Sequence, residues 1–162
     1  GGSEGQPAWI GQAARCLRTI MEATRRSGTV PSEALRALIG LGPGLTPSGD
    51  DLVAGYLIGL RCAARGKKER LRFLSDLGSA VIRLSAQTND ISRTCLFHAA
   101  RGRASSRVLD LAGAICSGAP RAQAVKHTVA AMRLGHTSGA DTVTGLLIGL
   151  AVWDAPRLVG PL

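Results

Sequence analysis

The chain has 162 residues, the length of one ordinary domain, and 45% of them are apolar. This fraction is high enough to build a core and excludes wholesale disorder. Aromatic residues make up only 3% of the chain, which also contains 24 alanines and 21 glycines. Strands of a sandwich or barrel draw on aromatic and β-branched residues, so this composition favours closely packed helices.

Apolar residues recur at three- and four-residue steps along most of the chain, which is the period of an amphipathic helix. Prolines and glycines separate these stretches, and none of them has the pattern of a strand. In chain order we predict helices over 9–26, 32–39, 49–65, 68–86, 92–100, 106–115, 121–134 and 139–153. The predicted fold is therefore an all-α bundle of about seven or eight helices.

The helices are predicted to form a single domain over residues 9–155. Residues 1–8, which open with Gly-Gly-Ser, are expected to be a tag or linker remnant, and residues 156–162 a C-terminal tail. No stretch reaches the 18 uncharged apolar residues of a membrane span, and no signal peptide is visible. We expect a soluble, cytoplasmic protein.

Positive charge is concentrated in the middle of the chain. The net charge is +9, and residues 61–107 hold eleven basic residues against three acidic ones, a local excess of +8. Such a segment fits an acidic protein partner, an anionic substrate, or simply a solvated surface. We do not expect nucleic acid as a partner, because the charge is accompanied neither by interleaved aromatic residues nor by a recognisable binding module.

The four cysteines form no C-x-x-C pair, and each lies among apolar residues in a predicted helix: Cys16, Cys62, Cys95 and Cys116. We expect them to be free thiols in the core and not ligands of a metal. His98 and His127 are single histidines in helical stretches, and we expect them to be structural.

Two segments at a constant offset of 90 residues resemble each other. Residues 46–60 are TPSGDDLVAGYLIGL and residues 136–150 are HTSGADTVTGLLIGL, with nine identities in fifteen positions and no gap. This similarity predicts an internal repeat of one loop-helix unit.

Each predicted repeat helix has two glycines four residues apart, on one face: Gly55 and Gly59 in the first copy, Gly145 and Gly149 in the second. Glycine costs about 1 kcal/mol relative to alanine in a helix, so close packing must compensate for it. We predict that the two helices cross at these glycines around a pseudo-twofold axis. Their N-terminal loops would then meet at one end of the bundle.

The repeated loops allow two interpretations. In the first, Ser48 and Ser138 cap their helices, and Asp51 and Asp141 complete a capping box three residues later. In the second, the glycine-rich loops form a site, because backbone N–H groups at a helix start can hold an anion. The candidate catalytic residues are then His136 and Asp51, and the candidate substrate-binding residues are Thr46, Ser48, Gly49, Asp50, Thr137, Ser138, Gly139 and Asp141.

The side chains of these loops suggest distinct roles. His136 could polarise a carbonyl group, while the three carboxylates could orient an amide or hold a divalent cation. Magnesium is thus possible, although no cofactor is firmly predicted. The turn over residues 88–92, with Asp90 or Ser92 as its helix cap, could add a polar side chain to the site. Nothing resembles a nucleophile with a base, so we do not expect covalent catalysis.

The segments GLGPGLTPSGDDLVAGYLIGL and LGHTSGADTVTGLLIGL, with Thr88 and Ile91-Ser92 between them, resemble the AllH-like family. This family includes a subunit of the oxamate carbamoyltransferase of allantoin degradation. The resemblance covers roughly residues 30–153, and the chain looks like the C-terminal part of longer members. It implies a helical domain beside two other subunits, in a complex that converts oxalurate and phosphate to oxamate and carbamoyl phosphate.

Together, the loops and the resemblance predict a subunit of a carbamoyltransferase-type enzyme. It would bind a small anionic amido acid or carbamoyl phosphate between the two Ser-Gly loops. The two loops differ at one position, because Ala140 stands in the second where Asp50 stands in the first. The alternative is a noncatalytic scaffold subunit that docks an acidic partner through its basic middle segment.

Overall fold

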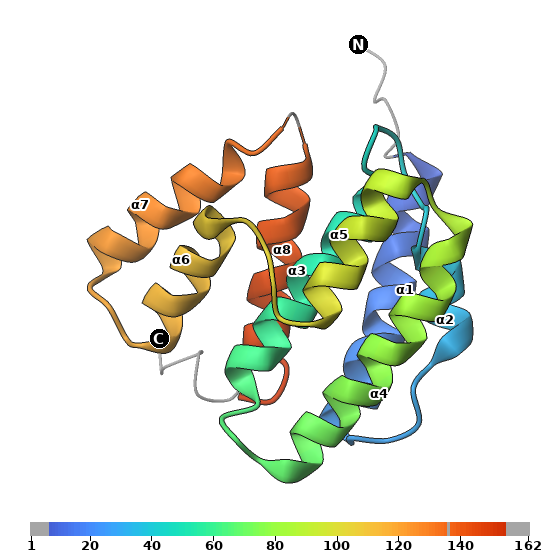
Figure 1. Cartoon of the computed structure of the whole chain (residues 1–162), viewed down its shortest axis with the longest axis horizontal. Helices are drawn as coiled ribbons and strands as arrows, with labels where there is room; N and C mark the ends of the chain where they lie inside the picture. Colours follow the sequence, from blue (N-terminus) through green and yellow to red (C-terminus); the bar gives the residue numbers. More distant parts are fainter. Residues whose placement is uncertain (1–6, 136, 155–162) are drawn as a thin grey trace.

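A computed structural model describes residues 7–135 and 137–154. Over these ranges it has eight α-helices, a short 3-10 turn and no strand, which confirms the all-α prediction (Figure 1). The elements are α1 (Ala8–Arg25), α2 (Ser32–Leu38), α3 (Ser48–Ala63), α4 (Lys68–Leu84), η1 (Ser85–Gln87), α5 (Asp90–Ala100), α6 (Ser106–Cys116), α7 (Arg121–Met132) and α8 (Ser138–Ala151). Each predicted helix is present, with ends that differ by at most two residues.

Proline fixes the start of four helices. The residues directly before α1, α2, α3 and α7 are Pro7, Pro31, Pro47 and Pro120. Proline has no N–H group and its ring restricts φ, so at a helix start it costs no helical hydrogen bond. The start of α5 is different, because the Asn89 side chain accepts a hydrogen bond from the Ser92 N–H at 3.0 Å. The predicted cap, Asp90 or Ser92, was therefore wrong by one to three positions.

Helices α3 and α8 form the central pair of the bundle (Figure 1). A Cβ on Gly55 would collide with the carbonyl oxygen of Thr142, and a Cβ on Gly145 would collide with that of Leu52. Thr142 and Leu52 are themselves 90 residues apart, so the two contacts correspond under the offset that relates the two sequence segments. The crossing therefore depends on the absence of side chains at these glycines.

The second pair of glycines repeats this arrangement one turn further along. A Cβ on Gly59 would collide with the carbonyl oxygen of Leu146, and one on Gly149 with that of Tyr56. Since the contacts advance in the same direction along both helices, α3 and α8 run parallel and begin at the same end of the bundle. These contacts confirm the prediction that the two helices cross at their paired glycines.

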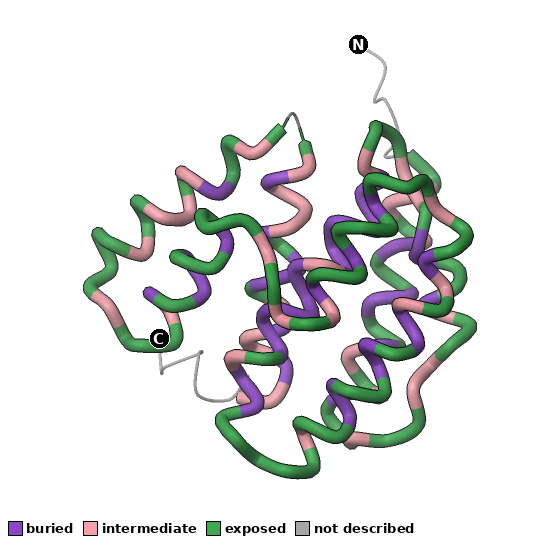
Figure 2. Tube along the Cα trace, viewed as in Figure 1, coloured by how far each residue is buried: buried purple, intermediate pink, exposed green. Residues whose placement is uncertain are grey.

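The other helices enclose this pair unevenly. Thirteen of the 16 residues of α3 are buried, whereas α7 at the edge of the molecule is mostly exposed (Figures 1 and 2). The Thr24 hydroxyl lies 2.7 Å from the Tyr56 hydroxyl and ties α1 to α3. No helix within the described ranges is long and apolar enough to cross a membrane.

Two of the four cysteines are not core residues. Cys16 is buried and Cys62 is half-buried, as their apolar surroundings predict, but Cys95 and Cys116 are exposed. The expectation of buried thiols was wrong for these two because α5 and α6 bury other faces, through residues such as Leu96 and Leu111.

Candidate functional site

The glycine-rich loop before α3 has a fixed shape. Gly42 and Gly44 adopt φ values of 101° and 102°, a backbone region that favours glycine. The Asn89 side-chain amide donates a hydrogen bond to the Leu45 carbonyl oxygen at 2.8 Å. The turn before α5 therefore stabilises the conformation of this loop through a hydrogen bond.

Asp50 holds the same loop from inside. One of its carboxylate oxygens accepts from the Gly40 N–H at 2.7 Å, and the other accepts from the Thr88 hydroxyl at 2.6 Å. Asp50 is almost fully buried, and both of its oxygens have partners within the protein. Thr88 belongs to the turn that, by the sequence analysis, could add a polar side chain to the site, and its hydroxyl binds Asp50.

The first glycine of each repeat also has a structural role. The Gly49 N–H donates to the Leu41 carbonyl oxygen at 2.8 Å, and the Gly139 N–H donates to the Leu134 carbonyl oxygen at 2.7 Å. A Cβ on Gly49 would collide with the backbone at the end of α2, and one on Gly139 would collide with the end of α7. Because both amides are already engaged, they are not free to hold an anion as we had predicted.

The capping interpretation of the loops is not supported by the hydrogen bonds. The residues at the cap positions of α3 and α8 are Pro47 and Thr137, and neither helix has a side-chain cap. Ser48 and Ser138 are instead the first helical residues, so Asp51 and Asp141 complete no capping box.

Asp51 and Asp141 form a carboxylate pair across the two repeats. Asp51 is 7% exposed, and its burial raises the pKa to about 6; the Ser138 and Thr46 hydroxyls oppose this rise, and the charges of Asp141 and Asp50 add to it. The Oδ2 atoms of Asp51 and Asp141 are buried and have no hydrogen-bond partner among the described residues. Such orphaned acceptors are costly, which indicates that a ligand or solvent donor completes them.

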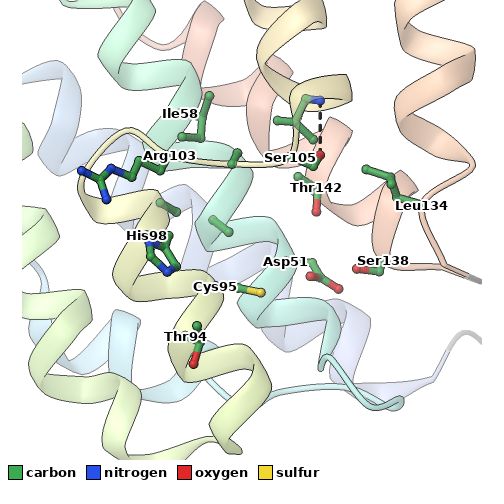
Figure 3. A pocket seen from close by; sticks show the side chains of 14 residues that line it. Asp51, Ile58, Thr94, Cys95, His98, Arg103, Ser105, Leu134, Ser138 and Thr142 are labelled. Carbon is green, nitrogen blue, oxygen red and sulfur yellow. Dashed lines mark hydrogen bonds between the residues drawn. The ribbon is translucent and has the colours of Figure 1, made fainter.

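A cavity of about 430 Å³ opens beside Asp51, between α3, α5, α6 and α8 (Figure 3). At its polar end Asp51 and Ser138 point toward each other, with Cys95 beside them. His98 and Arg103 line it on the side away from Ser138. The apolar residues that line the cavity are Ala54, Ile58, Ala99, Ala104, Val108 and Leu134.

The AllH family, described as oxamate carbamoyltransferase subunit AllH, matches residues 38–150. The chain belongs to the AllH family. The matched range encloses both repeated segments and every residue that lines the cavity. The family description relates the chain to a carbamoyltransferase that has further subunits. No solved structure matches the chain.

The cavity of this AllH-family chain includes only part of the predicted site. Asp51 and Ser138 line it, and Thr46 and Asp141 adjoin Asp51. The other predicted residues whose positions are described do not line it; they are Ser48, Gly49, Asp50, Thr137 and Gly139. His136 lies outside the described residues.

Several lining residues were not predicted. His98, which we expected to be structural, is exposed and faces the cavity, and Cys95 precedes it by one helical turn. Burial together with the charges of Asp51 and Asp50 raises the pKa of the Cys95 thiol. Thr142 follows Ser138 by four residues and so shares its helix face. The spacing of residues 95 and 98 on one helix face was the available signal, but the sequence does not show which face of α5 points toward α3.

The carboxylates near the cavity provide few ligands for a cation. The Asp50 oxygens are engaged with Gly40 and Thr88, which leaves Asp51 and Asp141. Within the part of the chain that the structure describes, no three or more His, Cys, Asp or Glu side chains are grouped to hold a metal ion.

Proposed function

We propose that this chain is a subunit of a carbamoyltransferase-type enzyme and binds a small anionic amide in the cavity beside the first turns of α3 and α8. One observation carries the proposal: Asp51 and Asp141 each bring a buried, unpartnered carboxylate oxygen to the start of α3 and α8. The family match to an oxamate carbamoyltransferase subunit supports it.

The carboxylate pair favours an N–H donor at the polar end of the cavity. An ionised carboxylate has no hydrogen to donate and can only accept hydrogen bonds, whereas a primary amide provides two N–H donors. A buried acceptor without a partner costs roughly 1–3 kcal/mol, so a ligand amide that satisfies Asp51 and Asp141 removes a penalty present in the free protein. A phosphate or carboxylate at this end would be repelled by both aspartates.

The opposite side of the cavity suits the anionic part of such a ligand. The guanidinium group of Arg103 can bind a carboxylate or phosphate through two parallel hydrogen bonds. His98 adds a second donor on that side. Oxamate and carbamoyl phosphate both combine a primary amide with an anionic group, which is the pattern that these two ends select.

Catalysis in this proposal consists mainly of orientation. The apolar wall limits water around the ligand, and the polar ends fix its direction toward an acceptor group. His136 remains the candidate for polarising the ligand carbonyl, with Thr46, Thr137 and Ser138 as hydroxyl donors. Asp50, Ser48, Gly49 and Gly139 would act indirectly, by shaping the loops.

A thermal-shift series tests this function with ligands of matched shape. Oxamate and carbamoyl phosphate should raise the melting temperature, because a ligand at 100 times its dissociation constant stabilises the folded state by about 2.7 kcal/mol. Pyruvate, in which a methyl group replaces the NH₂ of oxamate, should leave the melting temperature unchanged. Repeating each measurement with magnesium chloride shows whether a cation contributes to binding. An equal response to pyruvate and oxamate, or no response to either amide, would refute the proposal.

A noncatalytic scaffold is the second candidate function. Its supporting observation is a basic group at the junction of α5 and α6: Arg101 and Arg103 in the linker and Arg107 in the first turn of α6 are exposed and form no ion pair with a described residue. Reversing these three charges should abolish binding to the other subunits of the enzyme if the linker docks them, while Asp51→Asn should not.

A further inference from the structure

We propose that the outward face of α7 docks another subunit of the carbamoyltransferase, through an apolar patch on that subunit bordered by acidic residues. The face carries Val125, Val129 and Met132, spaced four and three residues apart and therefore aligned on one side of the helix. These side chains are 52%, 45% and 47% exposed. Together they form a stripe of large apolar residues that the described chain leaves uncovered.

The inner side of α7 carries smaller residues than this outer stripe. Only Ala131 of its 12 residues is buried, and Thr128 and Ala124, one and two turns before it, are half-buried. Helix α4 shows the usual arrangement, in which the large apolar residues, such as Phe73 and Leu77, face the core. Figure 2 shows α7 as a mostly exposed helix at the edge of the molecule. Exposed apolar stripes with this periodicity are typical of interaction surfaces.

The charges around the stripe select the partner. Arg121, Lys126 and Arg133 are all exposed, and no acidic residue occurs between positions 117 and 140. A second copy of this chain packed on the same face would bring basic residues against basic residues. A partner surface with Asp and Glu around an apolar centre is complementary to the stripe in both apolar character and charge.

Family membership indicates which proteins could provide such a partner surface. The AllH family is described as one subunit of a carbamoyltransferase, so the other subunits of that enzyme are the proteins to test. This inference depends on family membership and not on the cavity. Asp51→Asn, which tests the cavity, should therefore leave the docking intact.

The test measures binding of the chain to the other subunits of the same organism's oxamate carbamoyltransferase. The double variant Val129→Glu/Met132→Glu should weaken this binding at least tenfold, because a few central anchor residues carry most of the binding energy of an interface. Leu71→Glu is the matched control, since Leu71 is also exposed, at 41%, but lies on α4. The control should bind like the wild type, and all three proteins should melt at similar temperatures.

Reversing basic residues beside the stripe tests the charge complementarity in the same binding assay. Lys126→Glu/Arg133→Glu should also weaken binding, and added salt should weaken the wild-type complex more than that of this variant.

Five results would overturn the proposal. Three concern binding: the Val129→Glu/Met132→Glu variant binds with wild-type affinity, Leu71→Glu loses as much affinity as that variant, or the wild-type chain does not bind at all. The fourth is a large drop in the melting temperature of the Val129→Glu/Met132→Glu variant measured without a partner. The fifth is a homodimer of the wild-type chain that these two substitutions convert to monomers. Loss of binding only after reversing Arg101, Arg103 and Arg107 would place the docking surface at the junction of α5 and α6 instead.

Discussion

The carboxylate of Asp51 in α3 lies beside the hydroxyl of Ser138, the first residue of α8, although the two are 87 positions apart in the sequence (Figure 3). The parallel crossing of α3 and α8 at their glycines brings these residues together. The site therefore depends on the packing of two helices that the sequence marks as copies of one unit.

Stability should depend on pH through Asp51. The pKa of this carboxyl rises from 3.8 to about 6 in the folded protein, so the folded state holds the proton more tightly than the unfolded state. Its contribution to the free energy of unfolding is therefore greatest below pH 4 and is lost as the pH rises past about 6.

Asparagine at position 51 does not ionise, so the Asp51→Asn variant avoids the loss of stability that the wild type shows at high pH. At pH 8 its free energy of unfolding should exceed that of the wild type by about 1–3 kcal/mol. The difference should shrink toward pH 4, which urea unfolding across the pH range can measure. Asp110→Asn, at an exposed position on α6, is the control. A wild-type and Asp51→Asn pair that differ equally at all pH values would contradict the assignment.

Gly55→Ala should strongly destabilise the fold, by about 3 kcal/mol or more, because its Cβ would meet backbone atoms of α8 that cannot move independently. Gly113→Ala is the matched control, since nothing lies within 4 Å of a Cβ at this position in α6. It should stabilise the protein by about 0.5–1 kcal/mol through helix propensity. Denaturant unfolding of both variants measures the contrast, and a mild effect at Gly55 would mean that the helices do not cross there.

Thr88→Val should destabilise the loop before α3. The variant removes the donor at 2.6 Å from the Asp50 carboxylate, and a hydrogen bond to a charged group contributes about 1.5–3 kcal/mol. Thr88→Ser keeps the hydroxyl and should recover most of the free energy of unfolding. If Thr88→Ser were as unstable as Thr88→Val, the methyl group and not the hydrogen bond would be responsible.

Cys95 offers a chemical probe of the cavity. Because its pKa is raised, its alkylation by iodoacetamide should be slow at neutral pH and faster near pH 9. Oxamate should slow the reaction at Cys95 several-fold, as followed by mass spectrometry, and leave that of Cys116 unchanged, since Cys116 is exposed outside the cavity. Equal protection of both thiols would show that oxamate does not act at the cavity.

Helical periodicity, prolines and the paired glycines were sufficient to predict the helices and the central crossing. Glycine at four-residue spacing in a helix is unfavourable unless another backbone fills the space, so Gly55 and Gly59 carried information about tertiary packing. The sequence did not show, however, that Asp50 and Asp51 have different roles. They are adjacent in one helical turn, and only the position of the loop after α2 directs Asp50 toward Thr88.

The wall of the cavity was the least predictable part of the site. Cys95 and His98 lie on an amphipathic helix, and their orientation depends on how α5 packs against α3 and α4. Local sequence does not determine that packing, which arises from the large buried residues of all three helices.

Calorimetric titration of oxamate into the wild type, Asp51→Asn, Asp141→Asn and the double variant tests most directly whether the two repeats share one ligand. Each single substitution should weaken binding by about tenfold, and the double variant should lose less than the product of the two, because both aspartates bind the same amide. Wild-type affinity in either single variant would contradict a ligand site built from both repeats.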